Sequence, residues 1–136
     1  MIFNSKHIVV IDDAPAIRTF LRISLEGQGA IFSEAENAHD GLELCSRVRP
    51  DMVVLDLGLP DRDGLDILPE ILSCSGPNHP PSVIVLTVRK DIAMRDAAFT
   101  RGAVAYVTKP FIMDDLLDVM QEKMVVKERD SKPLSD

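Results

Sequence analysis

The stretch VVLDLGLPDRDG, residues 53–64, joins an apolar run to a carboxylate at the point where the run ends. Together with Met52, its first residues form the unbroken apolar segment MVVL. Continuous runs of this kind, rich in β-branched residues, are typical of strands buried on both faces of a parallel sheet. Asp56 follows directly, and the proline and glycines after it predict a loop. The stretch therefore predicts a central strand that delivers one charged side chain to the sheet edge.

Similar short runs elsewhere in the chain predict four further strands. IVVI at 8–11 and VIVL at 83–86 are continuous, whereas 30–32 and 105–107 are weaker. Between them, apolar residues recur at helical spacing. The first predicted helix begins at Pro15, and the second ends before Pro50. Three more helices are predicted over residues 65–72, 91–101 and 112–124. Alternating units of this kind predict an α/β fold, a doubly wound, flavodoxin-like (βα)5 parallel sheet with strand order 2-1-3-4-5.

Length and composition predict one globular domain, residues 1–124, followed by a polar tail or truncated linker, residues 125–136. The chain has 136 residues, 46% of them hydrophobic, which is enough for a core without metal or disulfide. Its net charge of −7 argues against nucleic acid or an anionic membrane as partner. No apolar run reaches the roughly 20 residues that span a bilayer, so we expect a cytoplasmic protein. Cys45 and Cys74 lack zinc or redox spacing and are expected to be ordinary reduced cysteines in the core.

Polar residues follow four of the predicted strands. Asp12 and Asp13 follow the first, Asp56 the third, Thr87 the fourth and Lys109 the fifth. Carboxylates gathered at one edge repel one another unless a cation neutralises them, and oxygen ligands favour Mg²⁺. An ammonium group and a hydroxyl group suit phosphoryl oxygens, and an aspartate can itself accept a phosphoryl group. The pattern predicts a Mg²⁺-dependent phosphoryl-transfer site centred on Asp56.

The same motifs, in this order, resemble the receiver domain of two-component response regulators over about residues 5–124. They are DD at 12–13, LDLGLPDRDG at 55–64, VLT at 85–87 and YVTKPF at 106–111. The resemblance implies that Asp56 accepts a phosphoryl group from a histidine kinase or phosphotransferase. It implies that Asp13 and the Gly58 carbonyl bind Mg²⁺ directly, that Asp12 acts through water, and that Lys109 pairs with the phosphoryl group.

The resemblance also implies a switch. Thr87 moves towards the phosphoryl group and Tyr106 turns inward, which alters the surface of the fourth helix, fifth strand and fifth helix that a downstream protein reads. Pro110 is expected to follow a cis peptide bond. The chain would be a regulatory phosphoacceptor that assists its own phosphorylation and dephosphorylation rather than an enzyme. A phosphorylation-linked dimer is compatible with this reading.

Two residues depart from the commonest pattern and leave alternatives open. Val88 stands where the family usually has alanine or glycine, and it could narrow access for the phosphoryl donor. Gly58 offers no side chain to help or hinder hydrolysis. One alternative is a receiver-like protein-binding module that is not phosphorylated in practice. Another is a Mg²⁺-dependent phosphohydrolase with an aspartyl nucleophile, although Gly58 occupies the position of the general acid in such enzymes.

Structural roles compete with functional ones at several aspartates. Asp12 or Asp13 alone could cap a helix, although two adjacent carboxylates exceed that need. We expect Asp63 and Asp91 to cap the third and fourth helices, and Asp61 to be a solvated turn residue. In the fourth helix, Met94, Ala97, Ala98 and Phe99 have core-like spacing and are expected to pack in the core, although any exposed members could contact a partner.

Overall fold

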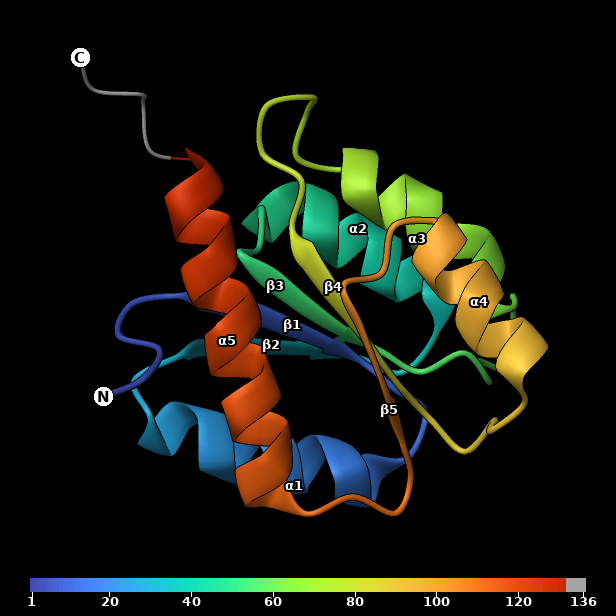
Figure 1. The fold of residues 1–136 in the computed structure, drawn as a ribbon, viewed down its shortest axis with the longest axis horizontal. Helices are drawn as coiled ribbons and strands as arrows, with labels where there is room; N and C mark the ends of the chain where they lie inside the picture. Colours follow the sequence, from blue (N-terminus) through green and yellow to red (C-terminus); the bar gives the residue numbers. More distant parts are fainter. Residues whose placement is uncertain (132–136) are drawn as a thin grey trace.

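The computed structural model describes the backbone of residues 1–131 and the side chains of residues 1–124. Its strands form one parallel sheet in the order β2-β1-β3-β4-β5, which confirms the predicted topology (Figure 1). The strands are β1 (His7–Ile11), β2 (Ile31–Ala35), β3 (Met52–Leu55), β4 (Ser82–Thr87) and β5 (Ala105–Thr108). Each strand is followed by a helix, as the alternating pattern indicates.

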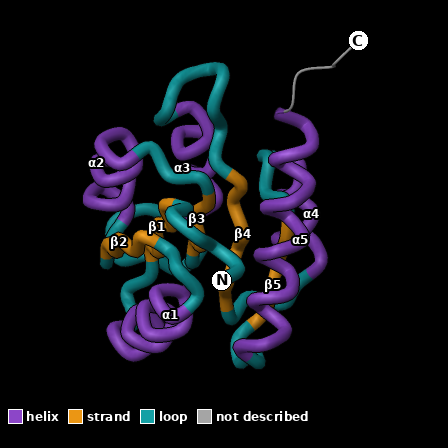
Figure 2. Tube along the Cα trace, turned by 90° about the vertical axis from the view of Figure 1, so that its left-hand side faces the viewer, coloured by secondary structure: helices purple, strands orange, loops and turns teal. Residues whose placement is uncertain are grey.

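Five helices cover the two faces of this sheet. They are α1 (Pro15–Gly27), α2 (Ala38–Val48), α3 (Gly64–Ser73), α4 (Ile92–Thr100) and α5 (Met113–Ser131). α1 and α5 pack on one face, and α2, α3 and α4 pack on the other. Figure 2 shows α1 on one side of the sheet and α2 with α3 on the opposite side.

The alternation of buried side chains explains why the central strands are continuously apolar. In β1, Ile8 and Val10 face the α1/α5 layer, whereas Val9 and Ile11 face the layer of α2, α3 and α4. All four are fully buried. A strand with a helix layer on each face has no solvated side.

Two predicted boundaries and one predicted core residue differ from the structure. β2 extends beyond the apolar residues 30–32 to Ala35, because an edge strand tolerates polar residues on its solvated side. α5 continues past 124 to Ser131, and residues 132–136 of the predicted tail lie outside the described part of the chain. Phe99 was predicted to be buried but is 39% exposed, because α4 turns mainly Ala98 towards the core.

The three aspartates near helix starts differ in how well their predicted roles hold. Asp63 caps α3, as its Oδ1 accepts a hydrogen bond from the Leu65 amide. Asp91 occupies the N-cap of α4, but its side chain makes no cap bond, so only its position was predicted correctly. Asp61, predicted to be merely solvated, accepts the amides of Ala38 and His39 at the start of α2. These amide bonds lower the pKa of Asp61.

Candidate functional site

The strand register brings three carboxylates together at the carboxyl edge of the sheet. Ile11 of β1 lies opposite Leu55 of β3, so the residues that follow them, Asp12 and Asp56, lie side by side. One ligand oxygen each of Asp12, Asp13 and Asp56 falls within 4.8 Å of the others. Asp12 is 2% exposed and Asp56 7% exposed, whereas Asp13 faces solvent. A buried carboxylate cluster of this kind fits a hard divalent cation that retains water on its open side.

Neither Asp12 nor Asp13 is the N-cap residue of α1, since that position is held by Ala14, which has no side-chain cap bond. Asp12 still has a structural role beside its place in the cluster, because its Oδ1 accepts the Ala14 amide at 2.9 Å. The second carboxylate, Asp13, lies exposed beside the site.

Lys109 supplies the positive charge that holds the cluster together. The register that sets Thr87 opposite Thr108 places Lys109 next, and its amide donates to the Thr87 carbonyl at 2.8 Å. Its Nζ donates to Asp12 Oδ2 at 2.7 Å and to Asp56 Oδ2 at 3.3 Å. The peptide bond between Lys109 and Pro110 is cis, as predicted.

Burial and pairing act in opposite directions on the ionisable groups of this cluster. Burial raises the pKa of the Asp12 carboxyl, although hydrogen bonds from Lys109 and the Ala14 amide oppose it. Burial alone would lower the pKa of Lys109, but its hydrogen bond to Asp12 and the charges of Asp12 and Asp56 raise it. Lys109 therefore stays charged, and the buried carboxylates depend on it for neutralisation.

Thr87, the last residue of β4, and Tyr106, on the edge strand β5, are the two residues of the predicted switch. Thr87 is fully buried, and its Oγ1 accepts the Arg89 amide at 3.4 Å. Tyr106 is half-buried, and its hydroxyl donates to the Arg89 carbonyl at 2.7 Å. Burial, followed by the charge of Asp91, raises the pKa of the Tyr106 phenol against the opposing charge of Arg89. Both residues predicted to form the switch thus contact the same loop residue.

The loop after Asp56 is shaped by two glycines. The Gly58 amide donates to Asp56 Oδ1 at 3.1 Å, and Gly58 forms an antiparallel bridge with Asp63. Gly64 packs so closely that a Cβ there would lie 2.6 Å from both the Asp56 carbonyl oxygen and the Leu57 Cα. Glycine at 64 therefore allows α3 to begin directly against the backbone of the proposed acceptor. The metal-ligand role of the Gly58 carbonyl stays a prediction.

Two residues in the loop after β4 bear on the site in different ways. The Val88 side chain, suspected of crowding the donor, is 66% exposed. Arg89 was not singled out from the sequence, yet its guanidinium pairs with Asp63 across the mouth of the site, with Nη1 and Oδ2 3.0 Å apart. The two residues lie 26 positions apart in the sequence, too far for a periodic signal to indicate this pairing.

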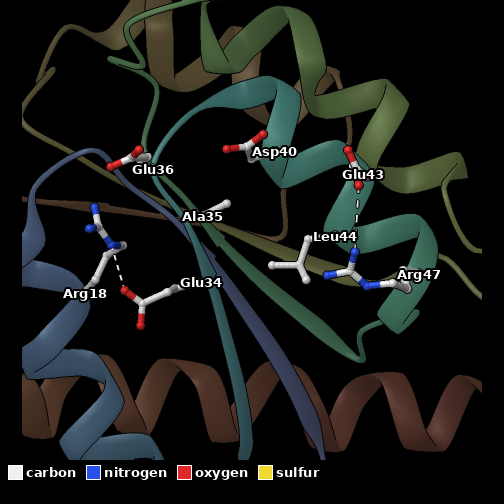
Figure 3. A pocket seen from close by; sticks show the side chains of 8 residues that line it. All are labelled: Arg18, Glu34, Ala35, Glu36, Asp40, Glu43, Leu44 and Arg47. Carbon is white, nitrogen blue, oxygen red and sulfur yellow. Dashed lines mark hydrogen bonds and ion pairs between the residues drawn. The ribbon is translucent and has the colours of Figure 1, made fainter.

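A polar pocket of about 330 Å³ lies beside the site, between α1, β2 and α2 (Figure 3). Arg18 donates to Glu34 at 2.9 Å, and Arg47 lies 3.8 Å from Glu43. Arg18 also donates to the Asp12 carbonyl at 2.7 Å, which ties this wall to the acidic cluster. Because both arginines are paired with carboxylates, we interpret the pocket as a polar surface that supports the neighbouring acidic cluster and not as a separate binding site.

The two cysteines remain free thiols, as predicted. Cys45 is buried on α2, whereas Cys74, also predicted to lie in the core, is only half-buried because it stands at the C-cap of α3. Burial, with a further contribution from Cys74, raises the pKa of the Cys45 thiol to about 12. A thiol with so high a pKa is a poor nucleophile at neutral pH.

With this fold and cluster in place, the chain can be assigned to a family. It belongs to the response regulator receiver domains, because the model of that family matches residues 8–121. Members of this family are regulatory phosphoacceptors of two-component signalling and bind Mg²⁺ at an acidic pocket. In this chain, Asp12, Asp13 and Asp56 form a cluster of carboxylates that could hold a metal ion.

Individual relatives agree with this assignment. The chain is 38% identical over 110 residues to the KDP operon transcriptional regulatory protein KdpE of Escherichia coli, covering 81% of this chain and 47% of that protein. A CheY-like receiver domain protein of Methanospirillum hungatei matches with a TM-score of 0.86 and 27% identity, covering 93% and 99% of the two chains. A BeF3-activated DrrB receiver domain matches with a TM-score of 0.77 and 29% identity, covering 89% and 97%. The chain spans about half the length of the curated relatives it matches.

Replacing Asp13 with asparagine is expected to raise the melting temperature in metal-free buffer by roughly 2–5 °C, because one of three mutually repelling carboxylates is lost. The same variant is expected to lose most of the stabilisation that Mg²⁺ gives the wild type. Thermal unfolding with and without Mg²⁺ measures both effects. Asp96→Asn removes an exposed carboxylate on α4 and serves as the control. A lower metal-free melting temperature for Asp13→Asn would contradict the proposed repulsion.

Proposed function

We propose that this receiver accepts a phosphoryl group on Asp56 from a histidine kinase or histidine phosphotransferase, with Mg²⁺, and that this modification switches a surface read by a downstream protein. The observation that carries the proposal is the contact of one ammonium group, Lys109 Nζ, with both Asp12 and Asp56 at the sheet edge. Asp56 is the carboxylate that directly follows the central strand β3, and its neighbours can serve an attached phosphoryl group.

Each neighbour of Asp56 has a distinct part in the proposed reaction. Asp56 attacks the donor phosphorus through a carboxylate oxygen, and the donor histidine nitrogen leaves with the bonding electrons. Lys109 pairs with a phosphoryl oxygen, and the Thr87 hydroxyl donates to another. Asp12, Asp13, Asp56 and the Gly58 carbonyl would hold Mg²⁺. When bound, the ion neutralises charge on the phosphoryl oxygens.

The switch is proposed to act through Thr87 and Tyr106 on the face formed by α4, β5 and α5. This face carries exposed apolar side chains, among them Ile92 at 73% and Ile112 at 67% exposure. A groove of about 390 Å³ lies along it, with Tyr106 and Ile112 among its lining residues. Apolar surface of this kind suits a protein partner, including a second copy of the chain on phosphorylation.

We propose a cytoplasmic location, where histidine kinases present their phosphoryl groups. No helix in residues 1–131 combines the length and apolar character needed to cross a membrane. The net charge of −7 disfavours direct contact of this chain with nucleic acid. The domain boundary near residue 124 is proposed on composition.

The receiver-like binding module without phosphorylation is the second candidate, and the phosphohydrolase the third. Val88, the residue that motivates the second candidate, is 66% exposed in the loop after β4, and labelling of Asp56 decides whether it obstructs a donor. The third lacks a general acid, because Gly58 has no side chain.

Intact mass after incubation with acetyl phosphate and Mg²⁺ separates the three candidates. The wild type is expected to gain the mass of one phosphoryl group, and Asp56→Asn is expected to gain none. An unmodified wild type that releases no phosphate would favour the binding module. Rapid, steady release of phosphate over many turnovers with no phosphoryl mass retained on the protein would favour the phosphohydrolase. Omission of Mg²⁺ is expected to abolish labelling.

A further inference from the structure

The short segment between β1 and α1 carries two of the three clustered carboxylates. Residues 12–14 join these elements. The Asp12 amide donates to the Ala35 carbonyl of β2 at 3.1 Å. The helix that follows begins without a side-chain cap, because its N-cap residue is Ala14. The place of the exposed Asp13 carboxylate in the cluster therefore depends on how the backbone of this segment is held.

One guanidinium group reaches back from α1 to this backbone. Arg18 Nη1 donates to the Asp12 carbonyl oxygen at 2.7 Å. That oxygen belongs to the peptide unit that joins Asp12 to Asp13, and a peptide unit is planar. Holding its oxygen limits the rotation of the whole unit, which ends at the Cα atoms of both aspartates. Arg18 thus contacts the backbone midway between two candidate metal ligands.

The other arm of the same guanidinium group is fixed by β2 (Figure 3). Arg18 Nε donates to Glu34 Oε1 at 2.9 Å, and these side chains are 13% and 27% exposed. Arg22, one turn further along α1, pairs with Glu34 Oε2. Burial would raise the pKa of Glu34, but the hydrogen bonds and charges of both arginines lower it. Because a guanidinium group is rigid and planar, fixing one arm on Glu34 sets the direction of the other.

The charge of Arg18 and its contact with the backbone have opposite effects on a bound cation. A positive charge beside the cluster repels Mg²⁺, so its removal alone would tighten binding. Loss of a contact that orders the ligands would weaken binding, because the ion must then pay for ordering them. The sign of the change in Mg²⁺ affinity therefore tells the two effects apart.

We infer that Arg18, braced by Glu34, is a positioning residue that holds the peptide between Asp12 and Asp13 in the arrangement in which both carboxylates serve Mg²⁺. This inference rests on the proposed Mg²⁺ site and adds to it a residue outside the carboxylate cluster. Residues that orient metal ligands change metal affinity by roughly tenfold or more when they are replaced. Arg18→Gln is therefore expected to raise the dissociation constant for Mg²⁺ by about tenfold.

Titration calorimetry of the whole chain with MgCl₂, well below the melting temperature, measures this constant. Arg22→Gln is the matched control, because it removes the same charge from the same Glu34 without touching the Asp12 carbonyl. Its affinity is expected to stay within about twofold of the wild type. A purely structural role of Arg18 would lower the melting temperature and leave the dissociation constant unchanged. Equal or tighter binding by Arg18→Gln, or an equal loss in Arg22→Gln, would overturn the inference.

Hydrogen exchange without metal gives the second readout. The Ala14 amide, which donates to Asp12 Oδ1, is expected to exchange roughly fivefold faster in Arg18→Gln and at the wild-type rate in Arg22→Gln. Unchanged exchange in Arg18→Gln would overturn the positioning role. If the wild type binds no Mg²⁺, the proposed Mg²⁺-dependent function fails, while the exchange rates still test whether Arg18 holds this segment.

Glu34→Gln keeps the test decisive if Arg18→Gln does not fold. This variant retains Arg18 but replaces the charged brace with an amide, which accepts weaker hydrogen bonds. It is expected to weaken Mg²⁺ binding and to speed exchange of the Ala14 amide, both by less than Arg18→Gln. Wild-type values of both quantities in Glu34→Gln would overturn the inference.

Discussion

Replacing Lys109 with alanine is expected to lower the free energy of unfolding by about 3 kcal/mol in metal-free buffer, the scale of removing one partner from a buried ion pair. The lost ammonium group now contacts Asp12 at 2.7 Å and Asp56 at 3.3 Å, and only 13% of the Lys109 side chain is exposed. Without this ammonium group, the buried carboxylates of Asp12 and Asp56 have no positively charged side chain to neutralise them. Urea unfolding of wild type and variant measures the loss.

Mg²⁺ and a surface lysine provide the controls for this variant. Added Mg²⁺ is expected to stabilise Lys109→Ala more than the wild type, because the ion replaces part of the missing positive charge. Lys90→Ala removes an exposed lysine in the loop between β4 and α4 and is expected to change the free energy of unfolding little. A loss for Lys109→Ala no larger than that for Lys90→Ala would show that the ion pair does not hold the cluster.

Replacing Gly64 with alanine is expected to cost about 3 kcal/mol of stability, at the upper end for an overpacked site. The new Cβ would meet the Asp56 carbonyl oxygen and the Leu57 Cα at 2.6 Å, and these backbone atoms cannot rotate away. Relief requires α3 to shift from the proposed acceptor, so labelling of Asp56 is expected to slow as well.

Gly27→Ala is the matched control, since a Cβ at Gly27, the last residue of α1, meets nothing within 4 Å. This change is expected to be neutral or to stabilise the protein by up to about 1 kcal/mol through the helix preference of alanine. Thermal and urea unfolding compare the two variants. Equal stabilities would contradict the close packing of α3 against Asp56.

The strand assignments were predictable because each central strand carries its own signal. MVVL and VIVL are continuously apolar since both faces of the sheet are covered, and this pattern sets strand type and sheet class together. The positions of Asp12 and Asp56 followed from the topology, because parallel strands end at one edge. β2 was harder to delimit, since its edge position permits Ser33 and Glu34 inside a strand.

The contacts across loops could not be predicted from local patterns. Arg89, in the loop after β4, accepts a hydrogen bond from Tyr106 on β5 and pairs with Asp63 in the loop after β3. Both contacts depend on how these three segments meet in the folded chain. Asp61 likewise binds amides 22 and 23 residues away at the start of α2. Phe99 shows the limit of helical spacing, because a short, weakly amphipathic helix does not fix which of its apolar residues face the core.

The central claim, that a phosphoryl group on Asp56 moves the Thr87 and Tyr106 region, can be measured in one sample. The chain has one tyrosine and no tryptophan, so its intrinsic emission reports on Tyr106 alone. After addition of acetyl phosphate and Mg²⁺, Tyr106 emission and phosphoryl mass are expected to change with the same time course, and neither is expected to change in Asp56→Asn. Full labelling of Asp56 with unchanged Tyr106 emission, or an emission change that persists in Asp56→Asn, would contradict the account.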